Sequence, residues 1–164
     1  MVTLTHTPTS GGLINPAESV GTLCNAYNTF FVLDACQSIG QIPINVKEIG
    51  CQVLSATSRK YLRGPRGVGF LYVEESALDQ IEPPFLDLRA ATWTSDMGYE
   101  IVDGAKRFEN WETNFAGKLG LGAAIDYALD LTVEKTSIRL KALAEILRSK
   151  LASLNQLSIH DQGQ

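Results

Sequence analysis

The sequence predicts an α/β fold in which helices flank a mostly parallel sheet, and three observations support this prediction. Short apolar runs at residues 30–33, 52–56 and 67–73 are typical of buried strands. Helical patterns lie between and after these runs. The order of strand, helix and strand favours right-handed connections within a single sheet.

The first half of the chain alternates strands and helices. Residues 1–6 form a candidate strand that ends in a turn-rich segment. Asn15 is the expected N-cap of a helix that runs to about Tyr27, with Pro16 at its first position. The strands at 30–33, 52–56 and 67–73 then follow, with a short helical turn near 46–49.

The second half becomes helical only after a long irregular segment. Residues 74–116 show no clear periodicity, and a helix is expected from Gly117. A longer helix is expected from about Val133 to Leu154. The residues that can share one apolar face of the first helix are Leu119, Leu121, Ala124, Ile125, Ala128 and Leu129. The chain stops soon after the second helix without an obvious terminal element, so we expect a truncated sequence.

Composition and charge narrow the expected partners. The 164 residues suffice for one domain with a single hydrophobic core. The formal charge is −4, so neither nucleic acid nor an anionic membrane surface is an expected partner. No apolar stretch approaches the roughly 20 residues that span a bilayer.

The three cysteines point to a reducing compartment. Cys24, Cys36 and Cys51 show no metal-ligand spacing and cannot all pair within one chain, so we expect no metal site. Reduced thiols and the absence of a signal-peptide pattern favour a cytoplasmic location. We expect Cys36 to be a small packing residue on the sheet side.

Two residues that could carry chemistry follow predicted strands. Asp34 and Lys60 each come after an apolar run, and ligands of open α/β sheets bind outside the carboxyl ends of the strands. Arg59, Arg63 and Arg66 supply cations that favour a neutral, nucleophilic amine. From position alone, the simpler interpretations are favoured: Asp34 caps a turn, and Lys60 is a solvated surface lysine.

Three segments together are far more specific than these residues taken singly. Asp34-Ala-Cys-Gln37, Thr57-Ser-Arg-Lys60 and Gly64-Pro-Arg-Gly-Val-Gly69 resemble the motifs of the class V aminotransferase family. The family uses pyridoxal 5'-phosphate (PLP) and includes cysteine desulfurases, selenocysteine lyases and isopenicillin-N-epimerase-like proteins. Further matches follow in the same order over nearly the whole chain: Thr5-His6, Gly11-Gly12, Arg107-Phe-Glu109 and Gly120 to Tyr127.

The resemblance implies a fold and a division of the chain. It predicts a fragment of the large domain of a type I PLP-transferase. Residues 1–132 would be the C-terminal part of the PLP-binding large domain. Residues 133–164 would be a long linking helix and the start of a truncated small domain.

The resemblance also implies roles for individual residues. Lys60 would bind PLP covalently as a Schiff base and act as general base at the substrate α-carbon. Asp34 would pair with the pyridine nitrogen, and Gln37 would donate a hydrogen bond to the phenolic oxygen of the ring. Thr57 would bind the phosphate through its hydroxyl group.

Several positions depart from the family pattern. Arg59 stands where many members have His, and its guanidinium offers donors and positive charge to the phosphate. Thr9 falls where desulfurases have an Asn near the cofactor. Residues 110–114 differ from the desulfurase pattern, and Thr113 or Asn114 would reach the phosphate of the neighbouring subunit in a homodimer. These departures favour a lyase or transferase branch other than a routine cysteine desulfurase.

Two functional interpretations follow. In the first, the chain is part of a PLP-dependent enzyme that acts on a small amino acid, by group transfer or by cleaving a C–S bond. Family members carry further sequence on both sides, so we expect weak or no activity from this chain alone. The alternative is a non-catalytic α/β module that associates with itself through strand edges and apolar faces. A Schiff-base lyase without PLP is disfavoured, because Asp34 and Gln37 would have no ring to bind.

Overall fold

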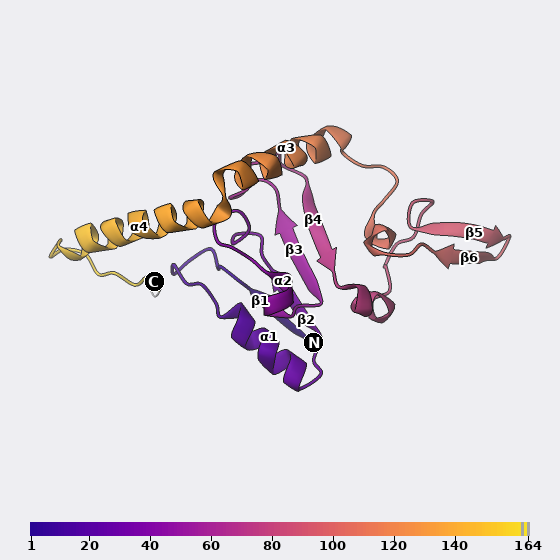
Figure 1. The fold of residues 1–164 in the computed structure, drawn as a ribbon, viewed down its shortest axis with the longest axis horizontal. Coiled ribbons are helices and arrows are strands. Elements are labelled where there is room, and N and C mark those ends of the chain that lie inside the picture. The colour runs from indigo at the N-terminus through magenta and orange to yellow at the C-terminus, as the bar shows by residue number, and fades with distance from the viewer. Residues whose placement is uncertain (162, 164) are drawn as a thin grey trace.

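A four-stranded sheet forms the centre of the molecule in the computed structural model, which describes residues 1–161 and 163 (Figure 1). The strands lie across the sheet in chain order: β1 (Val2–Thr5), β2 (Phe31–Asp34), β3 (Val53–Thr57) and β4 (Gly69–Val73). β1, β2 and β3 are parallel, and β4 is antiparallel to β3. The prediction of an α/β fold with a mostly parallel sheet is therefore confirmed.

The sheet is apolar at its centre, where one face of β2 is fully covered. Phe31 and Leu33 of β2 are fully buried, and Leu54 of β3 is 2% exposed. Helices α1 (Ala17–Ala26) and α2 (Val46–Ile49) contribute to the same hydrophobic core. This core fixes the strands whose carboxyl ends carry the polar residues described below.

Helix α1 begins differently from the prediction. Its N-cap is Pro16, without a side-chain hydrogen bond to the helix. Asn15 instead donates from Nδ2 to the Thr5 carbonyl oxygen at 2.7 Å, and its backbone N–H donates to the His6 carbonyl oxygen at 2.8 Å. The prediction that Asn15 caps this helix is wrong, because the loop after β1 brings Asn15 back to the end of that strand.

The segment without clear periodicity contains a hairpin that projects from one side of the sheet (Figure 1). It consists of β5 (Ala91–Ser95) and β6 (Gly98–Ile101), and 3-10 helices lie at Glu75–Gln80 and Ala105–Phe108. Arg107 connects three parts of this segment through hydrogen bonds. Its Nε donates to the Val102 carbonyl oxygen at 3.1 Å, and its Nη1 donates to the Leu78 carbonyl oxygen at 3.4 Å.

Two helices complete the chain. Helix α3 (Phe115–Leu131) is followed directly by α4 (Val133–Ala152), with a break at Thr132, whose φ is 61°. α4 extends away from the sheet on the side opposite the hairpin (Figure 1). None of the described helices combines the length and the apolarity needed to cross a bilayer.

The predicted apolar face of α3 is only partly covered. Leu121 and Ala128 are buried, and they pack with Leu62 of the loop between β3 and β4. Leu119 is 77% exposed and Leu129 is also exposed. The prediction of one shared buried face is therefore wrong for Leu119 and Leu129, because the loop covers only a narrow strip of the helix.

Candidate functional site

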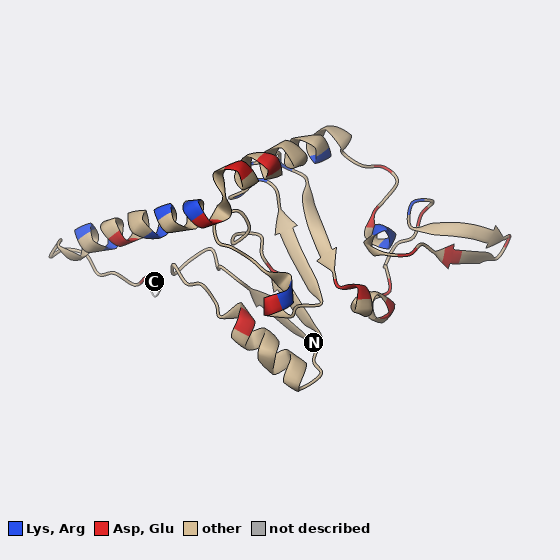
Figure 2. Cartoon of the chain, viewed as in Figure 1, with Lys and Arg blue, Asp and Glu red and all other residues tan. Residues whose placement is uncertain are grey.

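The carboxyl ends of β1, β2 and β3 form one rim of the sheet, because these strands are parallel. Thr5, Asp34 and Thr57 are the last residues of the three strands. Asp34 is the one charged residue within the four sheet strands as the structure describes them, and Figure 2 shows these strands almost entirely uncharged. A carboxylate at the rim of an apolar sheet needs polar partners.

Two hydrogen bonds hold the Asp34 carboxylate. Oδ1 accepts from the backbone N–H of Cys36 at 2.9 Å, and Oδ2 accepts from Thr5 Oγ1 at 3.4 Å. The register of the parallel strands places Thr5 opposite Asp34. An ionised carboxylate has about four acceptor positions, so Asp34 can still accept from a pyridinium N–H. Thr5 was not among the predicted site residues, although its place at the end of the first strand was a signal.

The Cys36 thiol lies at the same rim. Burial raises its pKa, and so do a hydrogen bond with Asp34 and the negative charge of Asp34, whereas the positive charge of Lys60 lowers it. The charges of Asp34 and Lys60 thus act on the pKa of this thiol in opposite directions. The expectation that Cys36 packs on the sheet side is wrong: it is only partly buried and lies outside the core that contains Cys24 and Cys51.

Gln37 and Thr9 meet beside this rim. Gln37 Nε2 donates to Thr9 Oγ1 at 2.9 Å and, more weakly, to the Thr7 carbonyl oxygen at 3.4 Å. A cavity of about 310 Å³ opens next to this pair and reaches Tyr61 and helix α4. The loop after β1 and the turn after β2 thus converge, as the sequence-based assignment of both residues to one site requires.

Lys60 lies in the loop that connects β3 to β4. Its carbonyl oxygen accepts from the Arg63 N–H at 2.9 Å, and the Ser58 carbonyl oxygen accepts from the Gly64 N–H at 3.0 Å. Lys60 is partly buried, and its amine forms no ion pair within the described part of the chain. A ligand at the rim can therefore reach this amine without first breaking a salt bridge.

The other predicted residues are less closely joined to this rim. Thr57 ends β3 opposite Gly69 and is partly buried, whereas Arg59 is exposed. Asn114 caps α3, since its Oδ1 accepts from the Gly117 N–H at 2.8 Å. The phosphate-binding roles of Thr57, Arg59 and Asn114 stay predictions.

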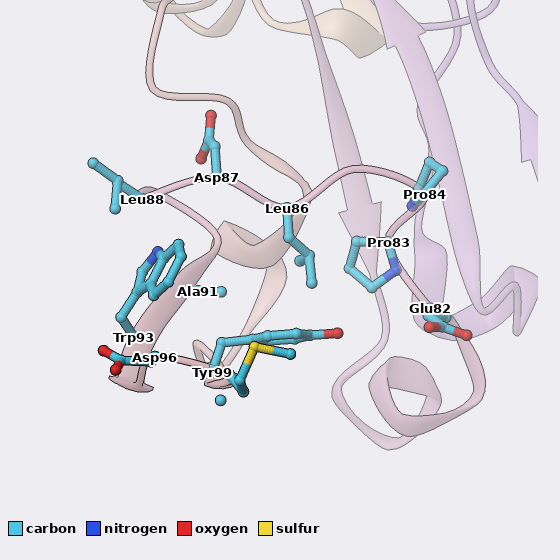
Figure 3. Close-up of a pocket in the computed structure, with 12 residues that line it drawn as sticks. Glu82, Pro83, Pro84, Leu86, Asp87, Leu88, Ala91, Trp93, Asp96 and Tyr99 are labelled. Carbon is cyan, nitrogen blue, oxygen red and sulfur yellow. The ribbon is translucent and has the colours of Figure 1, made fainter.

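Another cavity lies at the hairpin, away from this rim. It has a volume of about 760 Å³, and Figure 3 shows two of its walls, with Trp93, Asp96 and Tyr99 on the hairpin and Pro83, Pro84 and Leu86 on the segment that leads to it. Asp87 also lines it, and the N–H groups of Trp111 and Arg89 lower the pKa of that carboxyl group. Asp87 is therefore occupied in holding the loop.

The described residues contain no group of three or more His, Cys, Asp and Glu side chains arranged to hold a metal ion. The polar groups at and beside the rim include the Asp34 carboxylate and the Gln37 amide, and the Lys60 amine lies in the loop after β3.

Comparison with known proteins agrees with this geometry. The family model described as Aminotransferase class-V matches residues 1–164. The probable cysteine desulfurase of Methanothermobacter thermautotrophicus is 28% identical over 164 residues, which cover 100% of this chain and 41% of that protein. The probable cysteine desulfurase of Synechocystis sp. is 30% identical over 160 residues, which cover 98% of this chain and 38% of that protein.

A solved structure shows the same fold. The apo cysteine desulfurase of Thermococcus onnurineus matches with a TM-score of 0.86 at 29% identity, over 92% of this chain and 38% of that one. The chain therefore spans about two fifths of the length of the relatives that it matches.

Proposed function

The chain belongs to the class-V aminotransferase family, and from this premise we propose that it is part of a PLP-dependent enzyme that acts on a small amino acid. The position of Asp34 at the carboxyl end of β2, with its carboxylate held by Thr5 and the Cys36 N–H, carries this proposal together with Lys60 in the loop after β3. It supports a site in which a carboxylate and an amine can serve one planar ring.

The residues present fit such a cofactor. PLP supplies an electron-accepting ring that stabilises negative charge at the substrate α-carbon. Lys60 would hold the cofactor through its amine and then accept a proton from the α-carbon. Asp34 would keep a proton at the pyridine nitrogen. The Gln37 amide has two N–H groups, so it can stay bonded to Thr9 and exchange its longer bond to the Thr7 carbonyl oxygen for one to the phenolic oxygen.

Thr57 and Arg59 are the proposed phosphate partners on this side of the site. A hydroxyl group and a guanidinium are both donors, and the guanidinium adds positive charge. Asn114 would reach the phosphate bound by a second copy of the chain.

The proposed reaction is cleavage of a C–S bond in a small amino acid. Two relatives that are named probable cysteine desulfurases support this choice. The departures at Thr9, Arg59 and residues 110–114 favour a substrate or branch different from that of a routine cysteine desulfurase.

We propose that copies of the chain associate as homodimers in the cytoplasm. Exposed apolar side chains at the hairpin support association: Met97 is 95% exposed, and Trp93 and Tyr99 are also exposed. The same surface favours the second candidate function, a non-catalytic module that associates with itself. Both candidate functions predict association, which sedimentation would measure. Only a test of PLP binding therefore distinguishes the enzyme from the non-catalytic module.

The 164 residues alone are proposed to bind PLP weakly and to turn over little. The matched relatives are more than twice as long, and Thr57 and Arg59 are the phosphate partners proposed within one copy. The helix break at Thr132 supports the division into a large-domain part, 1–132, and a linking part, 133–164.

Reduction with borohydride tests the proposal. The chain is incubated with PLP, reduced, digested and mapped by mass spectrometry. A pyridoxyl adduct on Lys60 that is absent in Lys60→Ala and weaker in Asp34→Ala is the expected result. Lys47→Ala is the matched control, because Lys47 is exposed and forms an ion pair with Glu74 at 2.8 Å. An adduct spread evenly over surface lysines would overturn the proposal and leave the non-catalytic module.

A further inference from the structure

The turn that carries Lys60 contains a residue in an uncommon conformation. Arg63 has a φ of 61°, in the left-handed region that residues other than glycine seldom adopt. Its backbone N–H closes the turn by donating to the Lys60 carbonyl oxygen at 2.9 Å. The conformation of Arg63 and the direction of the Lys60 backbone are therefore linked.

The Arg63 side chain is held by helix α3. Its Cζ atom lies 4.9 Å from the centroid of the Tyr127 ring, within the distance at which a guanidinium is attracted to an aromatic face. Tyr127 is itself half-exposed, so this contact lies at the surface and does not support the hydrophobic core.

The same loop also packs closely against α3 nearer the start of the helix. A Cβ atom at Gly120 would lie 2.6 Å from Pro65 Cγ, and one at Gly117 would lie 2.6 Å from Val68 Cγ1. Both distances are too short for real Cβ contacts, so glycine allows the helix to approach the loop. α3 therefore backs the loop from Leu62 to Val68, and the Arg63–Tyr127 contact lies at the surface next to the buried packing of Leu62.

We propose that Tyr127 is a positioning residue that keeps Arg63 in its left-handed conformation and thereby fixes the direction in which Lys60 leaves the turn. The inference rests on the proposed function, in which Lys60 holds PLP. Tyr127 acts through Arg63 and does not itself contact the cofactor. The hydrogen bond that closes the turn is present without PLP, so its opening can be measured separately from PLP binding.

Substitutions at Tyr127 test the inference. Tyr127→Phe keeps the aromatic face, whereas Tyr127→Leu keeps an apolar side chain and removes the face. We expect Tyr127→Leu to raise the dissociation constant of PLP about twofold to fivefold, the effect of an exposed cation–π contact, and Tyr127→Phe to match the unmodified chain. Leu129→Ala is the control, because Leu129 is an exposed residue of the same helix.

A double-mutant cycle shows whether Tyr127 affects PLP binding through Arg63 or through a general effect on the fold. Arg63→Gly removes the cation and accepts a positive φ without strain. In that background Tyr127→Leu should leave the affinity for PLP unchanged. An equal loss of affinity in both backgrounds would overturn the inference, because Tyr127 would then act without Arg63.

Hydrogen exchange supplies a readout that does not need PLP. The Arg63 amide should exchange faster in Tyr127→Leu than in Tyr127→Phe, since its bond to the Lys60 carbonyl oxygen would open more often. Equal exchange in the two variants would overturn the inference. If the unmodified chain forms no Lys60 adduct, the proposed function fails, and exchange still decides whether Tyr127 holds the turn.

Discussion

Thr5 Oγ1 donates a hydrogen bond of 3.4 Å to Asp34 Oδ2 across the parallel register of β1 and β2. Both residues are the last of their strands, so the sheet itself, and not a flexible loop, sets this contact. Thr5 can therefore orient the carboxylate that is proposed to serve the pyridine nitrogen.

Replacing Thr5 tests this orientation. Thr5→Val removes the donor at nearly the same volume, and we expect about twofold to tenfold weaker PLP binding, from about 0.5–1.5 kcal/mol for one hydrogen bond. Thr5→Ser should retain most of the affinity in the same spectrophotometric titration. Thr3→Val is the control, two residues earlier on the same face of β1. Equal affinity of Thr5→Val and Thr3→Val would show that the bond does not matter.

Alkylation of Cys36 measures the charges at the rim. Burial and the neighbouring Asp34 raise the pKa of this thiol, so its reaction with iodoacetamide should need a higher pH than that of a free cysteine. In the absence of PLP, Asp34→Asn should lower the midpoint of the pH–rate profile. Lys60→Met should raise it, because the lysine charge favours the thiolate. A midpoint insensitive to both substitutions would place these groups farther from the thiol.

His6 should make the fold sensitive to acid. Burial lowers the pKa of His6 below its ordinary value of 6.5, although the charge of Glu18 opposes the shift. The unfolded chain therefore binds this proton at a higher pH than the folded chain does. The stability that the neutral His6 imidazole contributes is fully present above pH 6.5, and it is lost as the pH falls through the lowered pKa.

The expected loss is at most about 1.4 kcal/mol per pH unit, measured by urea unfolding at several pH values. His6→Gln should remove this part of the pH dependence, whereas His160→Gln should leave it intact because His160 is exposed. The same acid loss in both variants would assign the effect to other groups.

Leu33 and Leu119 should differ in their contribution to stability. Leu33 is fully buried in β2, so Leu33→Ala should cost about 2–5 kcal/mol of the free energy of unfolding. Leu119 is 77% exposed, so Leu119→Ala should change stability by less than about 0.5 kcal/mol. Similar losses in urea unfolding would indicate that Leu119 is covered in solution, for example by a second copy of the chain.

The parallel part of the fold could be predicted from the sequence, because its strands leave short apolar runs such as that at Phe31–Leu33. The β5–β6 hairpin could not, because most of its side chains are exposed and no apolar alternation marks it. The position of Asn15 was misassigned, since a contact with the end of a distant strand outweighed its local preference for a helix cap.

The candidate site could be predicted where it depends on strand ends. Asp34 and Lys60 follow apolar runs, and motif resemblance joined them to Gln37. The contributions of Thr5, Cys36 and Tyr127 could not be predicted, because they depend on strand register, on the direction of a turn and on the packing of α3 against a loop. None of these three relationships leaves a periodic signal in the sequence.

The chain-order arrangement of the sheet has a consequence for how the rim assembles. Thr57 and Gly69 are 69 − 57 = 12 positions apart, whereas Thr5 and Asp34 are 34 − 5 = 29 positions apart. Closing the shorter loop costs about 0.8 kcal/mol less chain entropy. Pulse-labelled hydrogen exchange during refolding should therefore protect the amides of residues 69–73 before those of 2–5. The loop that carries Lys60 would then form early, and Thr5 would reach the Asp34 carboxylate as folding finishes.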